Sequence, residues 1–142
     1  MSDTLTLKEM SNAALAYYGD GVLELLVRER LVKSGLSTAA HLNVAARDYV
    51  TAPKQAQAME RLTPHLTEEE LGIYRRGRNN IHANVPKSAT VAQYRAATGM
   101  ECLFAALYLT GREERIKELL AASDNAAFEI KENVTVFKPI RR

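Results

Sequence analysis

The sequence lacks the residues and segments on which several protein classes depend. Its 142 residues include one cysteine, Cys102, which excludes an intramolecular disulfide framework and a cysteine-based zinc site. The longest apolar stretch, residues 102–109, has eight residues, far fewer than the roughly 20 needed to cross a bilayer. The N-terminus has no basic segment followed by an apolar one, so we expect no signal peptide. These absences predict a cytoplasmic protein without a membrane segment.

Negative charge is missing from one part of the chain. Overall, 19 Lys and Arg residues nearly balance 17 Asp and Glu residues. Residues 71–100, however, contain no Asp or Glu. The same segment contains these basic residues and one histidine: Arg75, Arg76, Arg78, Lys87, Arg95 and His82. It is a candidate contact for phosphate groups, and a solvated basic helix end and loop is the ordinary alternative.

Motifs for common cofactors are also missing. No glycine-rich phosphate-binding loop is present, so nothing indicates a nucleotide cofactor. The histidines, His41, His65 and His82, are scattered, and none has a partner at zinc-binding spacing. Cys102 lies in an apolar stretch and is better explained as a packed small residue than as a nucleophile.

Hydrophobic periodicity predicts an all-α fold. Apolar residues recur at helical spacing, without strand-like alternation before the C-terminal tail. We expect helices over residues 15–33 (ended by Gly35), from Ser37 or Thr38 to 50, from Pro53 onward, from the N-cap Thr67 to about Gly77, over 91–109 and over 113–122. The prediction is one bundle of six or seven helices.

The chain shows no linker or repeat that would separate two domains. We expect one domain over residues 1–125, with a loop at residues 78–87. Residues 126–142 form a tail, in which 132–136 has some strand character and the end is expected to be mobile.

Two acidic residues, Asp20 and Glu101, lie on apolar faces of the two most hydrophobic predicted helices, where acids are unusual. At 100° per residue, Asp20 and Glu101 each share a face with apolar residues. Because both helices should be central, both carboxylates are expected in or beside the core. A buried, unpaired carboxylate is costly, so it is usually neutralised, paired or bound to a metal.

Two explanations of these acids remain open. If the two faces pack together, Asp20 and Glu101 would repel each other, and a divalent cation such as Mg²⁺ or Mn²⁺ between them would relieve the conflict. Alternatively, each pairs with an arginine such as Arg28 or Arg95. Glu24, one turn after Asp20, could assist a metal or belong to an exposed ion pair.

Three glycines lie beside the two acids. Gly19 and Gly21 flank Asp20, and Gly99 lies two residues before Glu101. Each costs about 1 kcal/mol relative to alanine within a helix. Their placement indicates that something approaches the backbone closely, which is either a ligand or a neighbouring helix.

Short motifs follow one another in a characteristic order. The segment LAYYGDGVLE at residues 15–24 resembles the signature helix of the ribonuclease III family. The segments RGRN at 76–79, PK at 86–87, YR at 94–95 and AT at 97–98, followed by Glu101, resemble its short bacterial branch, Mini-ribonuclease III. That branch consists of the catalytic domain without a double-stranded-RNA-binding domain.

The resemblance assigns roles to both acids. Asp20 matches the family's catalytic aspartate and Glu101 its metal-binding glutamate, so both are expected to be catalytic and to bind Mg²⁺ or Mn²⁺. Full-length ribonuclease III has further acids where this chain has Ala13, Ala16 and Thr98. The short branch shares this reduced set, which leaves the number of bound metal ions open.

The resemblance also implies a reaction and an assembly. The expected activity is hydrolysis of phosphodiester bonds in double-stranded RNA, with 5′-phosphate and 3′-hydroxyl products. The expected substrate is the paired ends of precursor large-subunit (23S) ribosomal RNA. The expected enzyme is a homodimer with both active sites on one valley at the subunit interface, and the apolar surplus at residues 22–27 and 102–109 agrees with a dimer.

The acid-free segment would contact the RNA in this interpretation. Double-stranded RNA is recognised mainly through its shape, its phosphates and its 2′-hydroxyls. The candidate RNA-binding residues are Arg76, Arg78, Asn79, Asn80, Lys87 and Arg95. Arg95 could alternatively orient the Glu101 carboxylate.

Two other functions would be compatible with the same fold class. A non-catalytic ribonuclease III-fold module could bind structured RNA, but it would not need Asp20 and Glu101. A purely structural helical dimer would leave both acids and the acid-free segment unexplained.

Overall fold

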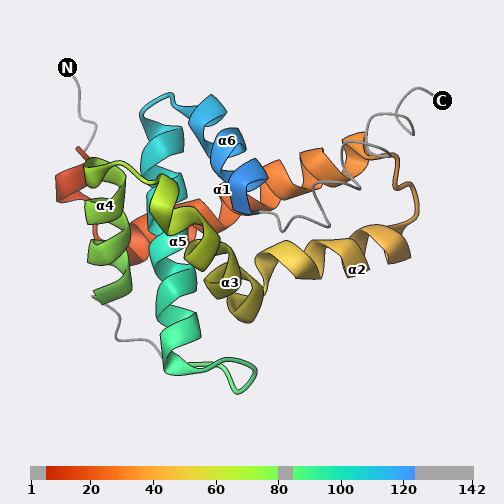
Figure 1. Cartoon of the computed structure of the whole chain (residues 1–142), viewed down its shortest axis with the longest axis horizontal. Coiled ribbons are helices and arrows are strands. Elements are labelled where there is room, and N and C mark those ends of the chain that lie inside the picture. Colours follow the sequence, from red (N-terminus) through yellow and green to blue (C-terminus); the bar gives the residue numbers. More distant parts are fainter. Residues whose placement is uncertain (1–5, 80–84, 124–142) are drawn as a thin grey trace.

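The described part of the protein, residues 6–79 and 85–123 of a computed structural model, is entirely helical. The elements are η1 (Leu7–Glu9), α1 (Asn12–Lys33), α2 (Ala39–Val50), α3 (Ala52–Leu62), η2 (Thr63–His65), α4 (Glu68–Asn79), α5 (Val91–Leu109) and α6 (Glu113–Ser123). The all-α prediction is therefore confirmed (Figure 1). The predicted tail at residues 126–142, its strand-like part and the boundary at residue 125 lie outside the described residues.

Helix ends follow the capping chemistry of the sequence. Thr38 caps α2 by accepting a hydrogen bond from the backbone N–H of His41. Gly35 follows the end of α1 with φ of 98°, a conformation that glycine adopts without strain. One prediction is corrected: α1 begins at Asn12 rather than at residue 15, because Ser11 caps it through the N–H of Ala14.

Helix α4 also runs further than expected. Gly77 was predicted to end it, but α4 continues to Asn79. A Cβ at Gly77 would lie 2.8 Å from the Sγ of Cys102 and 3.1 Å from the Cα of Gly99 on α5. Gly77 is therefore a packing residue at a helix crossing rather than a helix stop.

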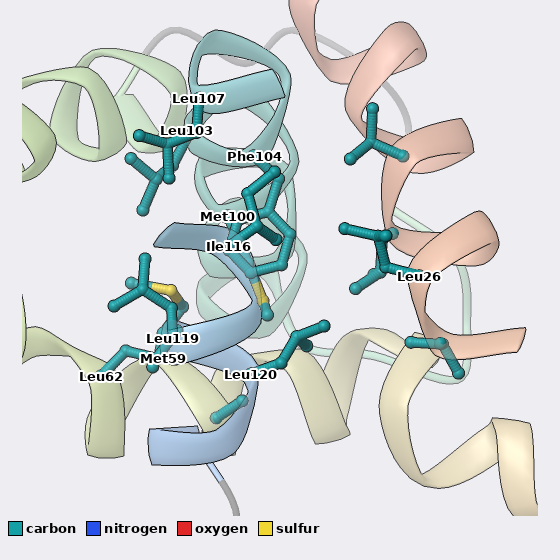
Figure 2. Packing of buried hydrophobic residues seen from close by; sticks show 14 of the residues in the cluster. Leu26, Met59, Leu62, Met100, Leu103, Phe104, Leu107, Ile116, Leu119 and Leu120 are labelled. Atoms are coloured by element: carbon teal, nitrogen blue, oxygen red, sulfur yellow. The ribbon is translucent and has the colours of Figure 1, made fainter. Parts of the chain in front are cut away.

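Helix α5 is the centre of the molecule and packs against α1, α3, α4 and α6. Figure 2 shows the core where side chains of α1, α3, α5 and α6 meet. The labelled side chains, all buried, are Leu26, Met59, Leu62, Met100, Leu103, Phe104, Leu107, Ile116, Leu119 and Leu120. No helix among the described residues combines the length and the apolar character that crossing a membrane requires.

Glycine sets the distance between α1 and α5. A Cβ at Gly19 would lie 1.7 Å from the backbone oxygen of Glu101, so only glycine permits this crossing. Gly99 is similarly close to the side chain and backbone of Tyr74. Helix packing therefore explains Gly19 and Gly99, whereas Gly21 faces open space. The close crossing brings the residue after Gly19, Asp20, next to Glu101.

A buried ion pair joins the start of α4 to α6. Glu70 is 2% exposed and accepts two hydrogen bonds, both 2.8 Å long, from the Arg115 guanidinium. Arg115 also donates to the backbone oxygen of His65. Glu70 and Thr67 form a reciprocal capping box, each side chain accepting from the other's backbone N–H. One carboxylate thus both caps α4 and anchors α6.

Candidate active site

The two carboxyl groups selected from the sequence meet at the crossing of α1 and α5. Glu101 is half-buried and Asp20 is exposed. Burial first, and then the negative charge of Asp20 and a hydrogen bond between the two side chains, together raise the pKa of Glu101 to about 8. At neutral pH and without a bound cation, Glu101 therefore keeps its proton and donates it in the hydrogen bond to Asp20.

The expectation that both acids lie in or beside the core is wrong for Asp20. The face of α1 that carries Asp20 is exposed to solvent in its N-terminal half and buried in its C-terminal half. Leu23 and Val27 are buried, but Ala13 is exposed and Tyr17 is 84% exposed. The described fold leaves Ala13 and Tyr17 of the N-terminal half of this face exposed, and Asp20 lies at this open end.

Neither carboxylate has an arginine partner among residues 6–79 and 85–123. Arg28, one of the proposed partners, pairs instead with Glu24 at 3.2 Å on the surface of α1. Arg95, the other, is exposed and forms no such pair in the described structure. Within the described residues, neither acid therefore pairs with Arg28 or Arg95, and Glu24 belongs to an exposed ion pair. Two carboxyl groups in contact without a compensating cation are what a divalent metal ion needs as ligands.

The two carboxyl groups lie in the wall of a pocket of about 660 Å³. Residues from α1, the end of α2 and the residue after it, α3, α5 and the segment before α5 line it. They are Asn12, Ala13, Ala16, Tyr17, Asp20, Val50, Thr51, Ala52, Gln55, Pro86, Ser88, Tyr94, Ala97, Thr98 and Glu101. Within the described chain, no third His, Cys, Asp or Glu joins the pair to form a larger ligand cluster.

Two polar residues of this wall were not identified from the sequence. Asn12 begins α1 and Gln55 lies in the first half of α3. A single amide side chain within a helix produces no periodic or motif signal, and neither residue is near Asp20 or Glu101 in a recognisable spacing. Only the packing of α3 against α5 brings Gln55 to the pocket.

Two of the predicted RNA-binding residues are adjacent to this pocket. Lys87 is exposed and lies between Pro86 and Ser88, both of which line the pocket. Arg95 is exposed and follows Tyr94, another lining residue. Lys87 and Arg95 are therefore each a sequence neighbour of residues that line the pocket.

The remaining candidates are distributed elsewhere on α4. The Arg78 guanidinium lies 5.5 Å from the centre of the Tyr74 ring, and Arg78 lines a separate pocket of about 270 Å³ between α3, α4 and α5. Asn79 is exposed beside it and accepts a hydrogen bond from Arg78. Asn80 lies outside the described residues. Arg78 thus lines a different pocket from the one beside Lys87 and Arg95, and binding of RNA by these residues stays a prediction.

Arg76 has a structural role. Its guanidinium is half-buried and donates to the backbone oxygens of Leu7 and Met10, at 3.4 and 2.7 Å. These bonds hold the N-terminal segment against α4. Binding of RNA by Arg76 stays a prediction, to which the structure adds this second function.

Comparison with known proteins shows which family the chain that carries this pocket resembles. A family model described as Ribonuclease III domain matches residues 13–112, a range that includes both Asp20 and Glu101. The chain belongs to the ribonuclease III family. Mini-ribonuclease 3 of Symbiobacterium thermophilum is 43% identical over 123 residues, which are 87% of this chain and 92% of that protein. Mini-ribonuclease 3 of Enterococcus faecalis is 41% identical, over 80% of this chain and 87% of that protein.

The fold of this ribonuclease III-type chain is also found in a solved structure. The crystal structure of protein FN1578 from Fusobacterium nucleatum superposes with a TM-score of 0.76 and 27% identity, covering 92% of this chain and 95% of that one. With the relatives at 41–43% identity, this confirms the Mini-ribonuclease III resemblance. The protein is an endoribonuclease of the ribonuclease III type, and the non-catalytic alternative is set aside.

Proposed function

We propose that this enzyme hydrolyses double-stranded RNA with a divalent metal ion held by Asp20 and Glu101. One observation carries the proposal: a half-buried carboxyl group lies against a second one, without a basic partner in the described structure, in a pocket of a ribonuclease III fold. Membership of the family supports a double-stranded RNA substrate.

The donor set fits a hard cation. Carboxylate oxygens are the ligands that Mg²⁺ and Mn²⁺ prefer, and these ions complete their shells with water and substrate phosphate. Asp20 and Glu101 would hold the ion, and Glu101 would release its proton on binding. When bound, such an ion polarises a phosphate oxygen and acidifies a water molecule.

The attacking group in this proposal is water rather than a side chain. Cys102, the residue after Glu101, is buried, and its Sγ donates to the backbone oxygen of Asn12. Burial raises the pKa of this thiol to about 11, so it is not ionised near neutral pH. Addition of water to phosphorus and departure of the 3′ oxygen would leave a 5′-phosphate and a 3′-hydroxyl.

Substrate phosphates would be held by the cations beside the pocket. Lys87 and Arg95 are exposed and adjacent in sequence to pocket residues. Arg78 and Asn79 would extend the contact along α4, and Asn80, which lies outside the described residues, belongs to the same proposed set. Such contacts position the duplex without reading its sequence.

We further propose that the enzyme is a homodimer through the exposed face of α1. Most apolar residues at positions 22–27 and 102–109 are buried in the chain's own core. An apolar hollow of about 420 Å³ remains, formed by Tyr17, Tyr18, Asp20, Gly21, Val22, Leu25 and Tyr108. Leu25 is 54% exposed, and the rings of Tyr18 and Tyr108 pack with centroids 6.2 Å apart. Because Asp20 lines both hollows, a second copy on this face would lie beside the active site.

The natural substrate we propose is the paired ends of precursor 23S ribosomal RNA. The test is to incubate the protein with this precursor and with a long RNA duplex of unrelated sequence, in Mg²⁺ and in EDTA. We expect cleavage of both RNAs in Mg²⁺ only, with defined ends on the precursor and 5′-phosphates on the products. Cleavage in EDTA would contradict the metal site, and random cleavage of the precursor would contradict the proposed substrate.

A further inference from the structure

A buried amide in the active-site pocket has no partner within the fold. Gln55 is 2% exposed and lines the pocket together with Asp20 and Glu101. Its Nε2 is buried and has no hydrogen-bond partner among the described residues. Because an unsatisfied buried donor destabilises a protein, native structures rarely retain one unless another molecule satisfies it.

A second polar atom in the same wall complements the first. The Oδ1 of Asn12 is also buried and without a partner in the described structure. Asn12 lies on α1 and Gln55 on α3, so the two amides reach the pocket from different helices. One atom is a donor and the other an acceptor.

The chemistry of this pair selects among the groups of a nucleic acid. Phosphate oxygens only accept hydrogen bonds and are drawn to cations, whereas the pocket wall here carries two carboxyl groups and neutral amides. A ribose 2′-hydroxyl both donates and accepts, so it can bond to either an amide nitrogen or an amide oxygen. The 2′-hydroxyl is also the group by which a protein distinguishes RNA from DNA.

We propose that Gln55, with Asn12, binds 2′-hydroxyl groups of the substrate strand in the pocket and thereby contributes to the selection of RNA. The amide N–H of Gln55 donates to a hydroxyl oxygen, and the Asn12 oxygen accepts from a hydroxyl. This inference rests on the proposed function, because it requires an RNA duplex next to Asp20 and Glu101.

The test compares Gln55→Met with wild type. Methionine has a similar length and is apolar, so it fills the buried site without an N–H donor. The matched control is Gln57→Met on the same helix, because Gln57 is exposed and does not line the pocket. Each protein is titrated in EDTA with an RNA duplex and with the same duplex carrying 2′-fluoro groups, which keep the A-form shape but remove the hydroxyl as a donor and replace its oxygen with a much weaker acceptor. Thermal unfolding is measured in parallel.

We expect Gln55→Met to unfold at the wild-type temperature or above and to bind the RNA duplex about 5- to 10-fold more weakly. The wild type should lose at least this factor on the 2′-fluoro duplex, because both hydroxyl contacts are lost there. Gln55→Met should lose a smaller factor, because it has only the Asn12 contact left to lose. Gln57→Met should behave as wild type.

Three results would overturn the inference. One is equal affinity of wild type and Gln55→Met for the RNA duplex. Another is that Gln55→Met binds both duplexes more weakly than wild type by the same factor, which would mean that the effect does not depend on the 2′-hydroxyl. The third needs no variant: wild type binding the 2′-fluoro duplex as tightly as RNA. If the wild type cleaves RNA but any of these results is found, only the inference about Gln55 fails and the proposed function stands. If the wild type neither binds nor cleaves RNA, both the proposed function and the inference fail.

Discussion

At the scale of single residues, the carboxyl pair makes the stability of the metal-free protein depend on pH. The fold raises the pKa of Glu101 to about 8, through burial first and through Asp20 second. The neutral form of Glu101 is therefore favoured by folding, and its stabilising contribution is complete below the unfolded pKa near 4.5. That contribution is lost as the pH rises through 8.

We predict that the free energy of unfolding of the metal-free protein, measured by urea denaturation, falls by roughly 2–4 kcal/mol between pH 5 and pH 8 and then levels. Glu101→Gln cannot ionise, so its stability should not show this decrease. At pH 8, Mg²⁺ should raise the free energy of unfolding of the wild type but not that of Glu101→Gln. Parallel pH profiles for the two proteins would contradict the account of Glu101.

A second residue-scale prediction concerns the glycine beneath the site. Gly19→Ala would place a Cβ 1.7 Å from the Glu101 backbone oxygen, so α1 and α5 must separate. We expect a loss of at least about 3 kcal/mol in the free energy of unfolding, or failure to fold. Gly72→Ala is the control: it is also within a helix, but its Cβ would have no described atom within 4 Å. It should gain about 0.5–1 kcal/mol. Equal effects at both positions would show that the crossing is not tight.

Residue-level reasoning from the sequence found the residues that break a pattern. Asp20 and Glu101 stand out because they are acids on apolar helix faces, and Gly19 because it lies within a helix. Gln55 breaks no pattern, and its importance depends on which helix packs beside it. The structural bonds of Arg76 to Leu7 and Met10 depend likewise on tertiary contacts that a basic segment does not reveal.

At the scale of helices, the sequence predicts what local chemistry determines. Caps and helix-compatible proline specify where α2, α3 and α5 begin, because the side chain and the backbone groups it bonds lie within one turn. The end of α4 was predicted wrongly because Gly77 serves a crossing with α5. A glycine that stops a helix and a glycine that permits close packing look the same in one sequence.

The ion pair between α4 and α6 provides a prediction at this scale. Hydrogen bonding to Arg115 lowers the pKa of Glu70, so its contribution is present above pH 4.5 and is lost as the pH falls through the folded-state pKa. Glu70→Gln should lower the free energy of unfolding at pH 7 by about 2–4 kcal/mol, because it leaves the Arg115 charge without its partner. Glu69→Gln breaks the exposed pair with Arg112 and should cost less than about 1 kcal/mol.

Denaturation at pH 7 and at pH 3 distinguishes this account from a simple packing effect. The difference between wild type and Glu70→Gln should shrink at pH 3, because below pH 4.5 the unfolded state binds a proton that the ion pair disfavours in the folded state. A difference that is the same at both pH values would mean that charge plays no part.

At the scale of the whole molecule, the exposed apolar face of α1 predicts the assembly. Gel filtration with light scattering at micromolar concentration should give twice the 15.8 kDa mass of the chain. Leu25→Glu places a charge in the apolar hollow and should shift the protein to monomer. Val44→Glu, at an equally exposed apolar position on α2, should stay dimeric. A monomeric wild type, or a dimeric Leu25→Glu, would contradict the proposed interface.

The central claim is that the contact between Asp20 and Glu101 is the hydrolytic site, and Asp20→Asn tests it most directly. This near-isosteric change removes one carboxylate from an exposed position, so folding and binding of duplex RNA should persist. In Mg²⁺, single-turnover cleavage of the duplex should fall roughly 10³-fold or more relative to wild type. Glu24→Gln, which removes a surface carboxylate paired with Arg28 one turn away, should cleave as wild type does. An Asp20→Asn protein that cuts at the wild-type rate would contradict the account.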